Sequence, residues 1–320
     1  MKKITTALLT WCAALTAAAQ VYVWKDGQVI WSMTSGTPDS LTLTDPYAAF
    51  RFSVSDSASA RFAPGNLQYN DYYGEWSFAS SQYEVIGSMN TRIAPYYDGL
   101  IDLFGWGTCG WSIGFEPSST STEYTDYLVG GSWDNSLTGT YAMADWGVSN
   151  AVGGYAEGVW RTPSSDEWNY LFAGRDGAAS LFALATVCGV KGLILLPDNW
   201  RLPDGLTFTP SVNSHLTYTN GLYEDSSFTN DGYADNSYDA TQWNRMETAG
   251  AVFLPAAGRR WGTELRNYPN NPWGIYWSST TGSEERGGNV RALSFYMSGV
   301  TPLAETCRAY GCSVRLIRLD

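Results

Sequence analysis

The sequence predicts an α+β fold with two main helices, short antiparallel strands and long loops. From residue 50 onward, short runs rich in β-branched and aromatic residues alternate with Gly, Asn, Asp and Ser turns. Only two segments combine a capped start with a helical apolar stripe. Long loops dominate residues 65–160 and 204–237, and the second of these segments is rich in polar residues; long loops typically carry function or cover a core.

The first segment, residues 1–19, has the pattern of a secretory signal peptide: a basic start, a short apolar run and small residues. We expect cleavage between Ala19 and Gln20, and an exported chain at the cell surface, in the periplasm or outside the cell. Lipid attachment at Cys12 is the alternative, which the bulky Trp11 before it disfavours. No segment is long and apolar enough to predict a transmembrane helix.

The mature chain is expected to begin with a small β appendage, residues 20–48. Two β-rich runs flank Asp26-Gly27, and Asp-Gly between such runs is a strong hairpin signal. A further short strand is expected at 41–43. No linker divides the rest of the chain, so residues 49–320 are predicted to form one domain.

Helix signals are clearest at two places. Ser164 and Glu167 have the spacing of a capping box, and Asp239 and Gln242 repeat it with Asp as the cap. A third helix is expected within residues 176–186.

The end of the chain predicts a strand at 274–281, followed by adjacent antiparallel strands at 289–297 and 313–319. Within the second, three apolar residues are expected to face the core: Leu293, Phe295 and Met297. The intervening residues are expected to face outward: Ser294, Tyr296 and Ser298. Trp277 is expected to anchor the first strand in the core, and the hydroxyl groups after it to satisfy the backbone where it turns.

The charge balance argues against two kinds of partner. The chain has 19 basic residues, 31 acids and a formal net charge of −12. Loss of Lys2 and Lys3 would leave 17 basic residues and a net charge of 17 − 31 = −14. Nucleic acid and anionic lipid are therefore not expected to bind. The 15 Trp and 21 Tyr residues are expected to fill the core, with some left at the surface for binding.

Catalytic signals are sparse. His215 is the single histidine and lies in a polar run, so a serine or cysteine nucleophile would lack its usual base. No zinc or phosphate-loop spacing is present. Paired carboxylates of a glycosidase remain an alternative, with these candidates: Asp145, Asp166, Glu167, Glu284 and Glu285. No cofactor is expected, although the acid-rich residues 225–239 offer oxygens for calcium without the spacing of an EF-hand.

Several residues are interpreted as structural. The tetrapeptides at 160–163 and 200–203 share the pattern Trp-Arg-X-Pro. In each, the tryptophan is expected to be buried and the arginine to bind a carboxylate or loop carbonyls, which assigns Trp160, Arg161, Trp200 and Arg201 to the framework. Trp277 and Arg315 complete the set. Cys109, Cys188, Cys307 and Cys312 are too few for a disulfide scaffold in a chain this long, and their pairing stays open.

Four motifs together resemble one known family. The segments 160–168, 250–258, 276–279 and 311–315, read as WRTPSSDEW, GAVFLPAAG, YWSS and GCSVR, resemble the FISUMP-type "major paralogous" domain of exported surface proteins of gut-type Gram-negative bacteria. The resemblance implies a C-type-lectin-like fold, shared with formylglycine-generating enzymes and with the variable binding proteins of diversity-generating retroelements. The lectin-type calcium signature and the reactive cysteine pair of the formylglycine enzymes are not recognisable here.

The sequence therefore predicts an exported, non-catalytic binding or adhesion protein that recognises a glycan or protein ligand through its C-terminal strands and loops. The resemblance to the retroelement proteins directs attention to residues 284–310. The ligand-binding candidates are Arg291, Ser294, Tyr296, Ser298, Arg308 and Tyr310. The alternatives are a carbohydrate-active hydrolase that uses paired carboxylates, and a structural subunit of a surface assembly that docks through its β appendage.

Overall fold

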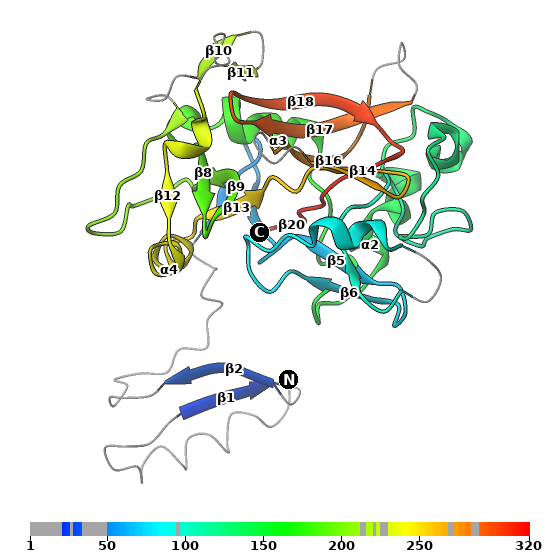
Figure 1. The fold of residues 1–320 in the computed structure, drawn as a ribbon, viewed down its shortest axis with the longest axis horizontal. Helices are drawn as coiled ribbons and strands as arrows, with labels where there is room; N and C mark the ends of the chain where they lie inside the picture. The colour runs from blue at the N-terminus through cyan, green and yellow to red at the C-terminus, as the bar shows by residue number, and fades with distance from the viewer. Residues whose placement is uncertain are drawn as a thin grey trace. The chain divides into compact units, whose positions relative to one another are not determined.

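The computed structural model contains two compact units, Met1–Pro46 and Tyr47–Asp320 (Figure 1). It describes residues 21–25, 28–33, 50–93, 97–211, 216–219, 222–224, 230–267, 272–282 and 288–320. In the first unit, β1 (Val21–Lys25) and β2 (Gln28–Met33) pair antiparallel with Lys25 opposite Gln28. This confirms the hairpin predicted at Asp26-Gly27. The predicted signal peptide and the strand at 41–43 lie outside the described residues.

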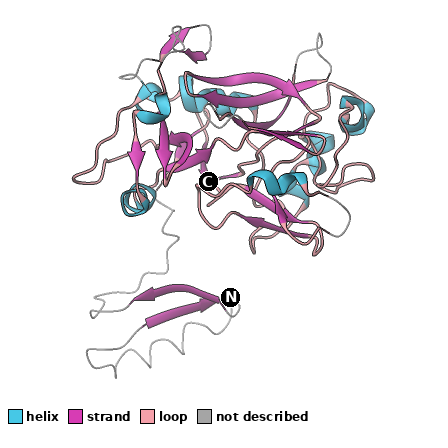
Figure 2. Cartoon of the chain, viewed as in Figure 1, coloured by secondary structure: helices cyan, strands magenta, loops and turns pink. Residues whose placement is uncertain are grey.

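The second unit is an α+β domain, as predicted, in which loops join several small sheets (Figure 2). Its largest described sheet has the order β10-β11-β18-β17-β16. The strands are β10 (Thr217–Thr219), β11 (Leu222–Glu224), β16 (Gly274–Thr281), β17 (Asn289–Tyr296) and β18 (Gly299–Cys307). A second sheet has the order β12-β8-β9-β13, from β8 (Phe182–Val187), β9 (Val190–Leu195), β12 (Ser237–Tyr238) and β13 (Val252–Pro255).

Three smaller sheets complete the described strands. One has the order β15-β14-β19, from β14 (Arg259–Trp261), β15 (Glu264–Arg266) and β19 (Tyr310–Gly311). Another joins the two ends of the domain through β3 (Phe52–Ser53), β4 (Ser59–Phe62) and β20 (Ile317–Leu319). The last contains β5 (Leu67–Asn70), β6 (Glu75–Phe78) and β7 (Leu100–Ile101). Pairing is antiparallel throughout these sheets except between β12 and β8, which are parallel.

Both predicted capped helices are present. In α3 (Ser165–Asn169), the Ser164 hydroxyl accepts from the Glu167 N–H, and the Glu167 carboxylate accepts from the Ser164 N–H. In α4 (Ala240–Thr248), Asp239 and Gln242 make the same reciprocal pair. Helix α3 continues into a π-helical turn at Tyr170–Gly174. The other described helices are α2 (Trp146–Ser149) and 3₁₀ turns at Gly87–Thr91, Tyr124–Tyr127, Val129–Gly131, Gly139–Ala144, Ala178–Ser180 and Gly232–Ala234.

The third predicted helix, within residues 176–186, is wrong. That segment contains one 3₁₀ turn and then β8, which pairs with β9 through a two-residue turn at Cys188-Gly189. Both turn residues have positive φ, 50° and 82°, as a tight hairpin requires. The apolar run in β8 is buried on both faces of its sheet, and a continuous apolar run of this kind does not distinguish a buried strand from a buried helix.

The strand β16 lies between two apolar clusters. Tyr276 packs with the cluster around α3 and β8, whereas Ile275 and Trp277 pack with the cluster around Trp106 and Trp146. Within β16, directly after Trp277, the pairing with β17 is irregular, and there the Ser278 hydroxyl donates to the Arg291 carbonyl at 2.8 Å. Trp277 is therefore a core residue, and the hydroxyl groups after it serve the backbone as the sequence predicts.

The predicted adjacency of strands 289–297 and 313–319 is wrong. The strand β18 was missed, and it pairs with β17, whereas β20 pairs with β4. Pro302 argued against a strand at this position, because proline has no N–H group to donate to a neighbouring strand. The structure accommodates it at an irregularity, since Ala292 faces Ala304 while Ser294 faces Thr301.

Of the six residues interpreted as structural, Trp160, Trp277 and Arg315 are buried, whereas Arg161 and Trp200 are only partly buried. The Trp160 ring is buried, and Trp200 packs against the cluster around α4. The Arg315 guanidinium is fully buried and donates to Asn66 Oδ1 at 3.1 Å and to the Ala63 and Phe253 carbonyl oxygens. Arg201, in contrast, is exposed, so its predicted role in organising a loop is not seen among the described residues.

Candidate functional site

The six predicted binding residues do not share one surface. Ser298 and Arg308 are buried, with 1% and 0% of their surface exposed, so the outward orientation predicted for Ser298 is wrong. The Arg308 guanidinium lies over the Trp106 ring and donates to the Trp133 carbonyl at 2.8 Å. Burial lowers its pKa to about 10, and its contacts are those of a loop clamp. In the sequence, an arginine in a predicted hairpin gives no signal that distinguishes a ligand-binding residue from one that clamps a loop.

The other four are partly exposed. Arg291 is held by its neighbouring strand, because its guanidinium contacts Glu305 at 3.3 Å and donates to the Leu303 carbonyl. Ser294 lies between Ile275 and Thr301 in the sheet. Tyr296 and Tyr310 instead reach a group of aromatic side chains that come from other segments.

That group begins on the small sheet β15-β14-β19. Arg259 and Trp261 alternate along β14 with the buried Arg260, so they share the opposite face. Tyr310 lies directly opposite Trp261 on β19, and Arg266 lies directly opposite Arg259 on β15. Residues directly opposite in an antiparallel pair have side chains on the same face. One sheet face therefore presents two rings and two guanidinium groups.

Trp273 joins this face through the backbone. The Gly258 N–H donates to the Trp273 carbonyl at 2.7 Å, which fixes Trp273 beside the start of β14. Gly258 has φ +75°, and a Cβ there would approach the Arg266 carbonyl oxygen to 2.7 Å. Only glycine suits this position.

The side chains form one chain of contacts. The Tyr296 ring lies 5.9 Å from the Trp273 ring, and the Arg259 guanidinium lies 5.8 Å from Trp273 and 4.2 Å from Tyr310. Tyr310 and Trp261 meet edge to face at 4.9 Å. We call these five residues the aromatic face. Trp273 is 36% exposed and the other four are partly exposed, so their rings and the guanidinium are accessible.

Three of these residues were not predicted from the sequence. Arg259, Trp261 and Trp273 lie before the predicted C-terminal strands. The signal was the alternation Arg-Arg-Trp before Gly262, which starts the two-residue turn between β14 and β15 with φ +58°. Their proximity to Tyr296 and Tyr310 depends on sheet pairing over long sequence distances, which a single sequence does not reveal.

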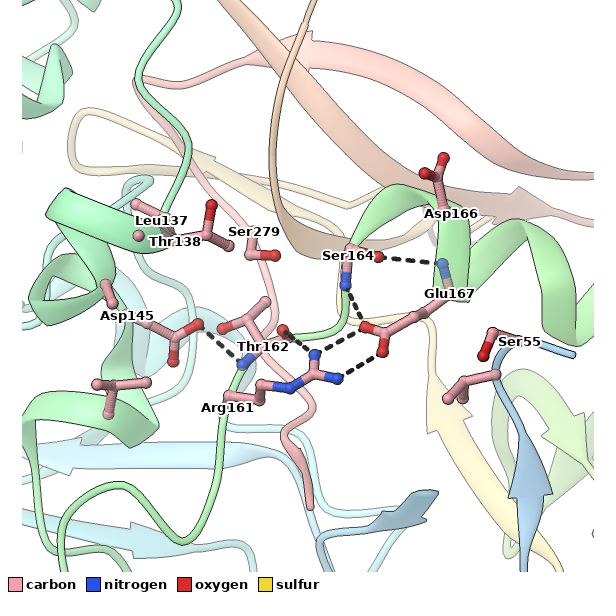
Figure 3. Close-up of a pocket in the computed structure, with 14 residues that line it drawn as sticks. Ser55, Leu137, Thr138, Asp145, Arg161, Thr162, Ser164, Asp166, Glu167 and Ser279 are labelled. Carbon is pink, nitrogen blue, oxygen red and sulfur yellow. Dashed lines mark hydrogen bonds and ion pairs between the residues drawn. The ribbon is translucent and has the colours of Figure 1, made fainter. Parts of the chain in front are cut away.

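A pocket of about 530 Å³ beside α3 contains three of the predicted acidic candidates (Figure 3). Asp145, Asp166 and Glu167 line it together with Arg161 and apolar side chains such as Leu137 and Val148. This volume suits a small ligand. The pocket is therefore the place where a hydrolase would have its catalytic carboxylates.

Two carboxylates in the pocket, the buried Asp145 and the partly buried Glu167, are already engaged. Glu167 forms a two-pronged ion pair with Arg161 and also accepts from the Ser164 N–H at 2.8 Å. The Asp145 oxygens accept from the Gly147 N–H at 3.0 Å and the Thr162 N–H at 2.9 Å. Asp166 is exposed and points away from that pair in Figure 3.

The Asp145 carboxyl is completely enclosed. Burial raises its pKa to about 6, against the opposing effect of its backbone hydrogen bonds. A general acid needs a proton to give to the substrate, but both oxygens of Asp145 face backbone N–H donors. The arrangement orders a loop and caps α2 rather than presenting an acid to the pocket.

The remaining chemical candidates give no site. His215, Glu284 and Glu285 lie outside the described residues, as do residues 225–229 of the predicted calcium segment. Asp231, in that segment, forms an ion pair with Lys191 at 2.8 Å. Within the described ranges, no three acidic, histidine or cysteine side chains form a group that fits a metal ion. Cys109, Cys188, Cys307 and Cys312 are free thiols.

The comparisons with family models, curated proteins and solved structures found no significant match to this chain. None of the described helices has the length and apolar character needed to cross a bilayer.

Proposed function

We propose that this chain is an exported, non-catalytic binding or adhesion protein whose glycan or protein ligand docks on the aromatic face. The observation that carries this proposal is the continuous chain of contacts from Tyr296 through Trp273, Arg259 and Tyr310 to Trp261. Tyr and Trp offer large, stiff and amphipathic contact area at binding surfaces.

The contrast with the core tryptophans supports this assignment. The indole N–H groups of Trp106, Trp146, Trp168 and Trp277 each donate to a backbone carbonyl, at distances of 2.6–3.2 Å. Those rings have a structural role. Trp261 and Trp273 are partly exposed instead, and it is this exposure that leaves their ring faces and indole N–H groups for a ligand, because the buried Trp160 and Trp243 also lack an indole acceptor.

We further propose a C-type-lectin-like architecture for the α+β domain. Its two capped helices, short antiparallel strands and long loops support this proposal, together with the motif resemblance. The resemblance placed the binding residues within residues 284–310. The aromatic face retains Tyr296 and Tyr310 from that region and adds residues from β14 and from the segment before β16.

The test is a glycan array and a protein array probed with the purified chain, with circular dichroism and a thermal melt to establish folding. We expect at least one class of ligand to bind, and Trp273→Ala to remove that binding while the melting temperature changes little. A folded chain that binds nothing on either array would contradict the proposal. Binding that survives both Trp273→Ala and Tyr310→Ala would move the site elsewhere.

A carbohydrate hydrolase is the second candidate, because three carboxylates line the 530 Å³ pocket beside α3. Release of reducing ends from a polysaccharide panel distinguishes the two functions. The binding proposal predicts no release. Release by the wild type that Asp145→Asn and Asp166→Asn abolish would replace it with the hydrolase.

A further inference from the structure

We infer that the aromatic face recognises a saccharide that carries a carboxylate, with Arg259 holding the carboxylate and the neighbouring rings packing against the sugar. This inference rests on the proposed binding function and names the chemistry of its ligand.

The charge on the aromatic face favours an anionic ligand. No carboxylate or other acceptor among the described residues binds the Arg259 guanidinium. Arg266 lies directly opposite on β15 and is paired only loosely, with Glu264 at 3.6 Å. Like charges directly opposite in a sheet repel. An anion at Arg259 would relieve this repulsion, so the sheet favours an anionic ligand at this point.

Arg259 differs in this respect from the arginines that the fold itself uses. Those donate to carboxylates or to carbonyl oxygens within the chain: Arg61, Arg161, Arg175, Arg260, Arg291, Arg308 and Arg315. Arg260, the next residue, shows the contrast most directly, because its guanidinium donates to the Gly262 and Ser119 carbonyls at 2.6 and 3.0 Å. Each of these buried or partly buried guanidinium groups thus has at least one acceptor within the chain, although the Nε atoms of Arg260 and Arg308 have none, whereas no described residue accepts from Arg259.

The geometry around Arg259 suits a carboxylate that is attached to a larger molecule. Its guanidinium lies 4.2 Å from the Tyr310 ring, so one face of the planar guanidinium packs against that ring. The N–H groups point outward in the plane of the guanidinium, where a carboxylate is bound by two parallel hydrogen bonds. Trp273 and Tyr310 flank the guanidinium, so a carboxylate bound there brings the rest of its molecule against aromatic rings. A pyranose ring fits, because its C–H faces are apolar and its edge is polar.

The overall charge restricts the ligand further. With a net charge of −12, the chain repels densely charged polyanions. A saccharide with one acidic unit among neutral sugars can pair its carboxylate with Arg259. It carries too little negative charge to be strongly repelled by the rest of the chain. The ligand class is therefore a sparsely acidic glycan, such as a neutral oligosaccharide with one uronic acid.

The experiment is isothermal titration of the purified chain with three matched probes. These are a xylo-oligosaccharide that carries one glucuronic acid, its methyl ester, and the unsubstituted xylo-oligosaccharide. We expect the acidic probe to bind about 10- to 100-fold more tightly than the ester, which is the ratio for one charge-assisted contact. Arg259→Gln should abolish that preference. The matched control Arg201→Gln, at an exposed arginine outside the aromatic face, should keep it.

The outcomes separate this inference from the proposed function. Equal binding of acid and ester, lost in Trp273→Ala, would overturn the acidic ligand and leave a neutral glycan site. No saccharide binding, combined with a protein ligand on the array that Trp273→Ala removes, would likewise overturn it while the binding function stands. A preference for the acidic probe that Arg259→Gln does not change would overturn the role of Arg259.

Discussion

The pocket beside α3 and the aromatic face both combine an arginine with neighbouring polar groups, but they use them differently. In the pocket, Arg161 is engaged by Glu167, and Asp145 accepts two backbone N–H groups. On the aromatic face, Arg259 packs on Tyr310 and no described residue accepts its hydrogen bonds. A pocket lined by charged residues is therefore weaker evidence of function than an accessible charge without a partner. The charged residues of the pocket are explained by their hydrogen bonds within the chain.

The first contrast separates two tryptophans that lie four positions apart. Trp277 is fully buried and donates to the Phe104 carbonyl, so Trp277→Ala should lower the free energy of unfolding by about 3–5 kcal/mol. Trp273→Ala removes a ring that is 36% exposed and should cost roughly 1 kcal/mol or less. Urea titration of both variants measures this. Equal losses would show that Trp273 is a core residue and would break the comparison.

A second contrast concerns two arginines. Arg315→Met leaves buried acceptors of Asn66, Ala63 and Phe253 unpaired, and each costs about 1–3 kcal/mol. The Arg259→Gln variant should change the free energy of unfolding by about 1 kcal/mol or less, because it removes the cation–π contacts with Tyr310 and Trp273 but no internal hydrogen bond. Chemical denaturation of the two proteins in one buffer is the measurement. A large loss in Arg259→Gln would mean that its guanidinium serves the fold.

The third prediction uses pH and concerns the pocket. Burial raises the pKa of Asp145 to about 6, and that of Asp102 likewise. A carboxyl with a raised pKa binds its proton more tightly in the folded chain, so its contribution to stability falls as pH rises from about 4 to about 6. For Asp145 the change amounts to roughly 2–3 kcal/mol.

The check is the difference between wild type and Asp145→Asn in urea midpoints from pH 4 to pH 7, since the other titrating groups are common to both. The variant should lose less stability over this range. Parallel curves for the two proteins would contradict the buried, desolvated carboxyl that the structure describes.

The smallest expected effect tests the capping box of α3. Ser164→Ala removes the acceptor of the Glu167 N–H and should cost about 1 kcal/mol. Asp239→Ala, at the equivalent position of α4, is the matched variant and should cost a similar amount. The measurement is the melting temperature of both variants. An unchanged melting temperature in both would show that the capping boxes do not stabilise the starts of α3 and α4.

These comparisons also show which parts of the molecule the sequence could predict. The capping boxes at Ser164 and Asp239 and the hairpin at Asp26-Gly27 were found because each is a contact between residues close in the chain. The alternation of Leu293 and Phe295 placed them correctly in the core. Strand β18 was missed because Pro302 argues against a strand in its sequence. The residues around Pro302 do not reveal the irregularity in strand pairing that accommodates it.

The candidate site was harder to predict because its residues come from distant segments. Tyr296 and Tyr310 were expected at the binding surface, and both lie on the aromatic face. Arg308 was expected there too, but it is buried against Trp106. Arg308, which clamps a loop, and Arg259, whose guanidinium has no acceptor among the described residues, have similar sequence surroundings. The difference is made by the partners that folding brings to each.

The most direct test of the central claim is amide hydrogen exchange of the purified chain with and without the glucuronic-acid-bearing oligosaccharide. The account predicts slowed exchange in β14, β15, β19 and around Trp273 and Tyr296. It predicts no change around Asp145 and α3. Protection confined to residues 138–167 would contradict the claim, because it would place the ligand in the pocket whose buried charges are already engaged by the fold.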